Sequence, residues 1–205
     1  MLVGTTAVAQ EKDVTKFLGI PVDGAKSDMI QKLKEKGFVP SSYKDMLEGE
    51  FNGTDVYISV VTNNNKVYRI MVSDKNNIGE TDIRIRFNNL CYQFENNPRY
   101  IKISDKEYTI KEDEDISYNI KVNDKRYVAS YIQMPSVKTV EETIVKLGYS
   151  KDDCSKEEVK QHLFQEVIKA SYNKQVWFMI DEFRGEYYII MYYDNALNQA
   201  NGEDL

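Results

Sequence analysis

Histidine and cysteine are scarce in this chain of 205 residues, which has one histidine, His162, and two cysteines, Cys91 and Cys154. These three residues cannot complete a tetrahedral zinc site without carboxylates. His162 falls beside Glu158 and Glu166 on the polar side of an expected helix, a setting more typical of a solvated residue than of a base or a metal ligand. The cysteines leave a disulfide open without requiring one. We therefore expect neither a metal site nor a histidine-based catalytic triad.

Glycine-rich phosphate-binding loops are also absent. The sequence contains neither G-x-x-x-x-G-K-[ST] nor G-x-G-x-x-G, and its ten glycines are scattered over turns. The acidic run 112–115 and the acidic C-terminal tail lack the spacing of a calcium-binding loop. We therefore expect no cofactor and no catalytic residue of a known motif. A hydrolase that uses a pair of carboxylates stays open, because two acids at a suitable separation can come from any part of such a fold.

Clustered positive charge and long apolar runs are missing as well. The formal net charge is −6, whereas nucleic acids and anionic membranes attract clustered Lys and Arg side chains. A nucleic-acid partner is therefore not expected. The sequence has no apolar run of about 18 residues, the length that a membrane-spanning helix requires, so no transmembrane segment is expected either.

The N-terminus carries a pattern typical of export. Ala7, Val8 and Ala9 form the small-x-small sequence that signal peptidase accepts, and polar residues follow from Gln10 onward. Because a basic region is absent and the apolar run is short, we interpret residues 1–9 as the end of a signal peptide whose start lies upstream of Met1. This interpretation predicts a periplasmic or secreted protein. The alternative is an ordinary N-terminus of a cytosolic protein.

The most apolar stretch lies near the C-terminus, at 175–195. Its two unbroken apolar runs, 176–180 and 187–193, are separated by a short polar turn that contains Gly185, which predicts a β-hairpin. Neither run alternates apolar with polar residues. We therefore expect the hairpin to lie in the middle of a sheet with both of its faces covered.

Apolar residues at helical spacing predict helices at 25–36, 80–97 and 156–172, and a capping-box spacing at Thr139 predicts another that ends at Gly148. Alternating patterns and turn residues between the helices predict strands, among them 116–122 with a turn at Asn123 and Asp124. The chain then divides into repeated units, each a helix followed by a β-meander: 10–77, 78–134 and, with only a hairpin, 135–205. The expected fold class is α+β, with antiparallel sheets, helices on one side, and one or two compact domains.

Tyrosine is abundant, with 15 residues in the chain. Tyrosine offers a large contact area with a polar tip, which suits both protein interfaces and sugar stacking. Because strand ends and the loops after them commonly carry contacts, the expected contact surface is the end of the last strand: Tyr192, Tyr193, Asp194 and Asn195. We therefore favour a non-enzymatic binding module for a protein or a glycan, with a carboxylate-pair hydrolase as the alternative. The sequence leaves the oligomeric state open.

Three stretches carry a resemblance to known sequences: FLGIPVDGAKSDMIQKLKEKGF, IRIRFNNLCYQFENN and GEYYIIMYYDNALNQANGEDL. Together they resemble exported proteins of gut Bacteroidota that have no assigned function. The succession of helices and antiparallel strands is similar to the tandem modules of β-lactamase-inhibitor-like proteins, an analogy of topology. The resemblance implies an exported protein with a binding role, and it carries no catalytic residues.

Overall fold

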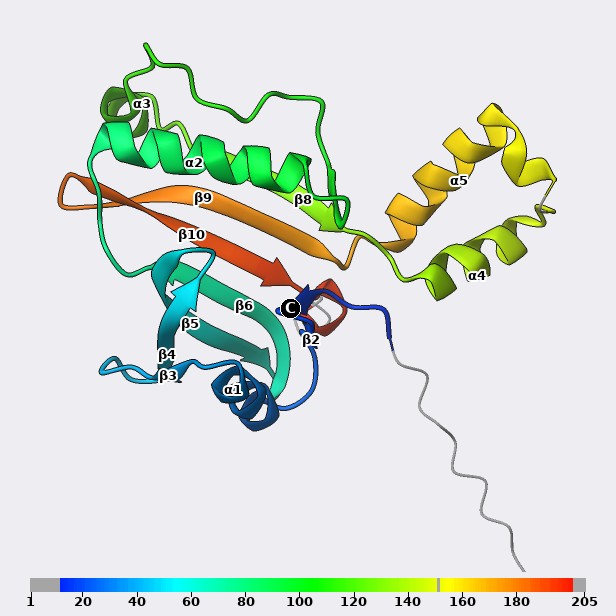
Figure 1. Cartoon of the computed structure of the whole chain (residues 1–205), viewed down its shortest axis with the longest axis horizontal. Helices are drawn as coiled ribbons and strands as arrows, with labels where there is room; N and C mark the ends of the chain where they lie inside the picture. Colours follow the sequence, from blue (N-terminus) through cyan, green and yellow to red (C-terminus); the bar gives the residue numbers. More distant parts are fainter. Residues whose placement is uncertain (1–11, 151, 201–205) are drawn as a thin grey trace, which may run out of the picture.

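The computed structural model describes residues 12–150 and 152–200. The predicted signal peptide at 1–9 lies outside these residues. Within them the chain has the expected α+β fold, in which helices pack against antiparallel strands (Figure 1). None of the described helices is both long and apolar enough to cross a membrane.

The described residues form one large antiparallel sheet of eight strands in the order β3-β4-β5-β6-β10-β9-β8-β7. The strands are β3 (Val39–Pro40), β4 (Met46–Phe51), β5 (Thr54–Asn63), β6 (Lys66–Asp74), β7 (Tyr100–Lys102), β8 (Val128–Gln133), β9 (Gln175–Phe183) and β10 (Glu186–Asp194). Two further short strands, β1 (Lys16–Phe17) and β2 (Ile20–Pro21), pair with each other. The predicted C-terminal hairpin is therefore confirmed as β9 and β10, and it lies in the middle of the sheet.

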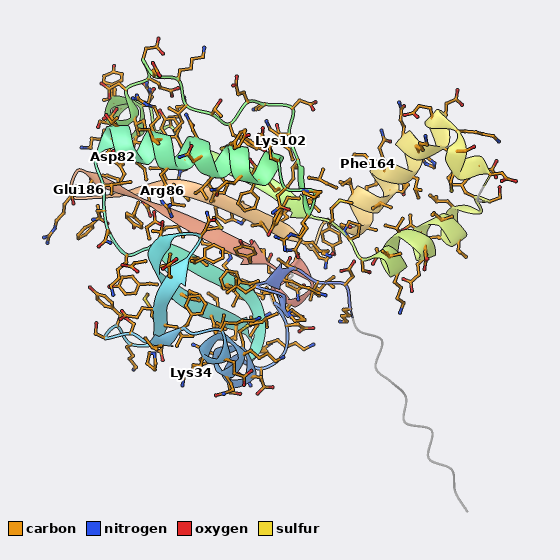
Figure 2. All side chains as sticks on the ribbon, viewed as in Figure 1. Lys34, Asp82, Arg86, Lys102, Phe164 and Glu186 are labelled. Atoms are coloured by element: carbon orange, nitrogen blue, oxygen red, sulfur yellow. The ribbon has the colours of Figure 1, made fainter. Side chains whose placement is uncertain are left out.

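Helices α1 (Lys26–Glu35) and α2 (Glu80–Glu95) cover one face of this sheet. Their buried side chains join those of the strands in a single hydrophobic core, so the three sequence units share one core. On β10 every second side chain enters this core, including Ile189, Met191 and Tyr193. An ion pair also crosses the layers, because Arg86 of α2 reaches down to Asp74 of β6 (Figure 2).

No helix of the described residues covers the other face of the sheet, which corrects the expectation that both faces of the hairpin are covered. The remaining side chains of β9 and β10, such as Trp177, Met179, Tyr188 and Tyr192, keep part of their surface in solvent. The sequence misled because these side chains are as apolar as those of the core. In this hairpin the two apolar runs therefore supply one buried face and one aromatic open face.

The segment predicted as a strand at 116–122 is a helix, α3 (Ile116–Val122). Asp115 caps this helix by accepting a hydrogen bond from the backbone N–H of Tyr118 at 2.7 Å. Ile116 is buried and Ile120 packs against the core, a spacing of four that suits a helix as well as a strand. The second unit is therefore not a meander: α3 stands between its strands β7 and β8.

Helices α4 (Val137–Leu147) and α5 (Glu157–Ala170) form an arm that projects from the end of the sheet between β8 and β9 (Figure 1). Helix α4 begins before the predicted capping box at Thr139, because the side chain of Ser136 caps it, and it ends at Gly148 as expected. A short 3₁₀ helix, η1 (Asp153–Ser155), connects the two helices. A second, η2 (Ala196–Asn198), follows β10. The arm buries little of its apolar surface, and Val145 is 78% exposed.

Candidate functional site

The register of the strands arranges the open face into rows that run across the sheet. One row contains Tyr57, Ser73, Ile190, Met179 and Val128. The next contains Ser59, Met71, Tyr192, Trp177 and Ser130. Because neighbouring strands lie about 5 Å apart, each row is a nearly continuous strip of side chains. We call these two rows, together with Arg69 and Asp194, the open-face surface.

Trp177 and Tyr192 form the centre of the open-face surface. They are directly opposite each other on β9 and β10, and their rings stack with centroids 4.0 Å apart and an interplanar angle of 18°. The guanidinium carbon of Arg69 lies 4.8 Å from the Tyr192 centroid and 5.6 Å from the Trp177 centroid. Both distances fit cation–π contacts, so the guanidinium of Arg69 contacts both rings of the stacked pair.

Asp194 fixes two of these side chains, Arg69 and Trp177. Its carboxylate accepts hydrogen bonds from Arg69 Nε at 2.6 Å, Arg69 Nη2 at 2.8 Å and Trp177 Nε1 at 2.9 Å. The Asp194 side chain is only 6% exposed, whereas Arg69 keeps 26%. The hydrogen bond with Asp194 raises the pKa of Arg69, although burial opposes this effect. Arg69 is therefore charged at all ordinary pH values, and the hydrogen bond from Trp177 Nε1 to Asp194 holds the indole in one orientation.

Polar groups border the open-face surface at the edge beside the Tyr57 row. Tyr188 donates a hydrogen bond to Asp181 Oδ2 at 3.3 Å. At the same edge Lys75 forms an ion pair with Glu48 at 3.1 Å and lies 5.3 Å from the ring of Tyr57. An apolar centre with a polar, solvent-exposed rim is the usual anatomy of a protein interface.

The structure separates the four residues predicted as a contact surface. Tyr192 and Asp194 belong to the open face. Tyr193 points into the core on the opposite face and is 4% exposed. Its ring centroid lies 4.9 Å from that of Phe17. Asn195 is fully buried and donates from Nδ2 to the carbonyl oxygen of Val22 at 2.8 Å, so it holds the chain rather than a ligand. Neither can contact a partner on the open face.

Sequence reasoning missed Trp177 and Arg69. Trp177 could have been found, because pairing the strands of the hairpin around its turn places Trp177 opposite Tyr192. Arg69 could not, since the sequence does not show that β6 rather than another strand lies beside β10.

A cleft of about 1130 Å³ opens on the helix-covered side of the sheet. It lies between the β1–β2 hairpin, the turn from β4 to β5, the C-terminal end of α2 and the base of the arm. Its apolar floor consists of Phe51, Leu90, Phe94, Tyr100, Met191 and Tyr193. The charged residues around it are Asp13, Lys16, Glu50, Arg99 and Lys174.

Asp13 and Lys174 form a buried ion pair at one end of this cleft, where the arm joins the body. Asp13 accepts hydrogen bonds from Lys174 Nζ at 2.5 Å, from the backbone N–H of Ser136 at 2.7 Å and from Thr139 Oγ1 at 2.7 Å. Burial alone would raise the pKa of Asp13, but these hydrogen bonds outweigh it and lower the pKa. The carboxylate is thus fully engaged in holding the arm.

His162, Cys91 and Cys154 lie outside both the open-face surface and the cleft. His162 Nδ1 shares a hydrogen bond with the hydroxyl of Tyr149 at 2.6 Å on the exposed arm. Cys91 and Cys154 are both free thiols, so the disulfide that the sequence left open is not formed. Burial raises the pKa of Cys91 to about 12, which makes it a poor nucleophile. Among the described residues no group of His, Cys, Asp and Glu side chains could hold a metal ion.

Comparisons with protein-family models, with curated proteins and with solved structures found no match to this chain. The resemblance to exported Bacteroidota proteins and to β-lactamase-inhibitor-like modules therefore stays a prediction.

Proposed function

We propose that this protein is a non-enzymatic binding module that holds a protein partner against its open-face surface. The observation that supports this proposal best is a sheet face rich in aromatic and methionine side chains that no helix within residues 12–150 and 152–200 covers. Soluble proteins rarely leave a large apolar face in solvent unless it binds something.

The composition of the surface favours a protein interface. Tyr, Trp, Met and Arg are the residues enriched in interface centres, and they account for most of the large side chains here: Tyr57, Arg69, Met71, Trp177, Met179 and Tyr192. Ser59, Ser73 and Ser130 lie between them in the same rows. These small side chains allow the partner to approach the sheet closely beside the aromatic rings.

The central cluster is organised before any partner arrives. Trp177 and Tyr192 stack on each other, and Asp194 holds both Trp177 and Arg69 through three hydrogen bonds. Ordering a flexible side chain costs roughly 0.5–1.5 kcal/mol on binding. Side chains that are already fixed avoid this cost, which is why buried, pre-ordered Trp, Tyr and Arg side chains dominate binding energy at interfaces.

A protein partner fits this geometry better than a glycan. A sugar ring stacks on the free face of an aromatic ring, whereas here one face of Trp177 and one face of Tyr192 are occupied by each other. The described open-face surface is also broad, since its rows run from β5 across to β8. A broad, gently twisted sheet face suits the flat surface of a folded protein.

The alternative of a carboxylate-pair hydrolase receives less support. Such an enzyme needs one carboxylic acid with a raised pKa to protonate the leaving group. Asp13, the acid at the inner end of the cleft, has a lowered pKa and three hydrogen-bond donors around it. It cannot supply a proton at neutral pH.

We also propose that the protein works outside the cytoplasm, as the cleavage pattern at Ala7 to Ala9 suggests. N-terminal sequencing of the protein isolated from its native cells tests this point. A chain that begins at or near Gln10 supports export, and an intact Met1 in the cytosolic fraction contradicts it.

Photo-crosslinking tests the binding proposal. A photoreactive phenylalanine analogue replaces Ser73 in the open-face surface and, as a matched control, the exposed Ser42 in the loop before β4. We expect one discrete crosslinked protein from position 73 in native cells and none of that mass from position 42. A second change, Ser59→Arg, places a bulky charge in the neighbouring row and should abolish the crosslink. Identical crosslinks from both positions would contradict the proposal.

A further inference from the structure

We propose that the cleft on the helix-covered side is a second binding site, which takes a small amphipathic anion: a molecule with an aromatic or aliphatic body and one acid group. This site lies on the opposite side of the sheet from the open-face surface and goes beyond the proposed function. The proposal rests on the shape of the cleft, its apolar floor and the unpaired cations at its rim.

The floor of the cleft supplies an apolar surface of the right size. Small-molecule sites are concave spaces of about 300–1,000 Å³ with mainly apolar walls, and this cleft measures about 1130 Å³. The ring centroids of Phe94 and Tyr100 lie 4.6 Å apart on one side of it. The ring centroids of Phe51 and Tyr193 lie 6.5 Å apart on another side. A planar or chain-like apolar body can rest against these rings.

The rim supplies the charge. Among the described residues neither Lys16 nor Arg99 forms an ion pair, although both line the cleft and both are exposed. Lys174 is neutralised by Asp13. Glu50 is the remaining acid of the lining, so the cleft carries one positive charge in excess within a protein of net charge −6. A local positive field on an acidic protein selects an anion.

The two cations are attached to fixed walls. The side chain of Gln133 bonds to both backbone groups of Lys16, accepting from its N–H at 2.7 Å and donating to its carbonyl at 3.0 Å. Arg99 is held by Asn97, whose Oδ1 accepts from the backbone N–H of Arg99 at 3.1 Å, and by Met134, which donates to the carbonyl of Arg99 at 2.7 Å. These hydrogen bonds fix the backbone positions from which the two charged side chains extend.

Arg99 also lies next to the floor, because it directly precedes Tyr100 and both residues line the cleft. An acid group bound to Arg99 would therefore lie at the edge of the apolar floor. This juxtaposition of charge and apolar surface defines the ligand class.

A pair of fluorescent probes tests the proposal. The anionic probe is 8-anilinonaphthalene-1-sulfonate, and N-phenyl-1-naphthylamine has the same aromatic body without the charge. We expect Arg99→Gln or Lys16→Gln to weaken binding of the anionic probe by roughly fivefold at low salt, the order of one exposed ion pair, and to leave the neutral probe within about twofold. Glu50→Gln should strengthen binding of the anionic probe and leave the neutral probe within about twofold, whereas misfolding exposes apolar surface and would increase binding of both probes.

Two control variants locate the probe. Arg126→Gln removes an exposed arginine outside the cleft, and Ser59→Arg alters the open-face surface; both should bind the anionic probe like the wild type. The proposal is overturned if the wild type binds neither probe, if Arg99→Gln and Arg126→Gln behave alike, or if Ser59→Arg alone abolishes binding. The last result would place the probe on the open face, so the two sites can fail separately.

Discussion

The ion pair between Arg69 and Asp194 is the part of the open-face surface whose loss can be measured without knowing a partner. Asp194→Ala leaves the guanidinium of Arg69 and the indole N–H of Trp177 without their acceptor. Arg69→Met removes the charge and keeps the apolar length of the side chain. The double variant removes both charged partners.

The size of the effect follows from burial. Breaking a fully buried ion pair by removing one partner costs about 3–5 kcal/mol. Arg69 retains 26% exposure, so water recovers part of its solvation, and we expect Asp194→Ala to cost about 2–3 kcal/mol. For a chain of this length that corresponds to a fall in Tm of about 5–10 °C. In the double-mutant cycle the two changes should couple by about 1–2 kcal/mol.

Urea unfolding followed by tryptophan fluorescence provides the assay, because Trp177 is the only tryptophan in the chain and lies within the cluster. Tyr57→Phe, which removes one hydroxyl from the periphery of the same surface, serves as the control and should leave the midpoint nearly unchanged. A coupling energy indistinguishable from zero would refute the view that Asp194 locks Arg69 and Trp177 in place.

Three further changes test the fold beneath the sites. Asp13→Asn should cost about 2–4 kcal/mol at neutral pH, since it leaves Lys174, which is 4% exposed, without its counter-charge. Because the folded-state pKa of Asp13 is lowered, the wild type should lose this stabilisation as the pH falls below about 4. The free energy of unfolding of Asp13→Asn, measured by urea titration, should change less with pH in this range. Gly49→Ala should cost about 1–3 kcal/mol, since its Cβ would lie 2.7 Å from the buried ring of Phe38, and a Tm equal to that of the wild type would refute this contact. Phe178→Ala, which opens a cavity in the core, should cost about 3–5 kcal/mol by calorimetry, and a cost below about 1 kcal/mol would contradict its burial.

The sequence predicted the parts of the fold that depend on local patterns. The hairpin of β9 and β10 follows from two apolar runs around Gly185, and α2 follows from apolar residues at steps of three and four. The error at 116–122 arose because Tyr118, Ile120 and Val122 alternate with polar residues as they would in a strand. In the helix that forms, capped by Asp115, Tyr118 and Val122 are exposed instead.

The candidate sites could be predicted only in part. Alternation along β10 separates Tyr192 from Tyr193, but the sequence does not say which of the two faces lacks a helix. The cleft combines β1, β4, α2 and the base of the arm, segments up to about 160 residues apart in the chain that meet only in the folded state. Local sequence propensity does not predict such long-range contacts.

The most direct test of the binding proposal is a titration of the purified partner, identified by crosslinking at position 73, with two matched variants. Ser59→Arg adds a charged side chain within the rows of the open-face surface, whereas Ser42→Arg adds the same side chain on an exposed loop. Neither serine side chain has a hydrogen-bond partner among the described residues, so both variants should keep the wild-type Tm. We expect Ser59→Arg to weaken binding at least about a hundredfold, the effect of a buried unpaired charge at an interface centre, and Ser42→Arg to leave the affinity unchanged. Equal affinities for the two variants would contradict the assignment of the open face as the binding surface.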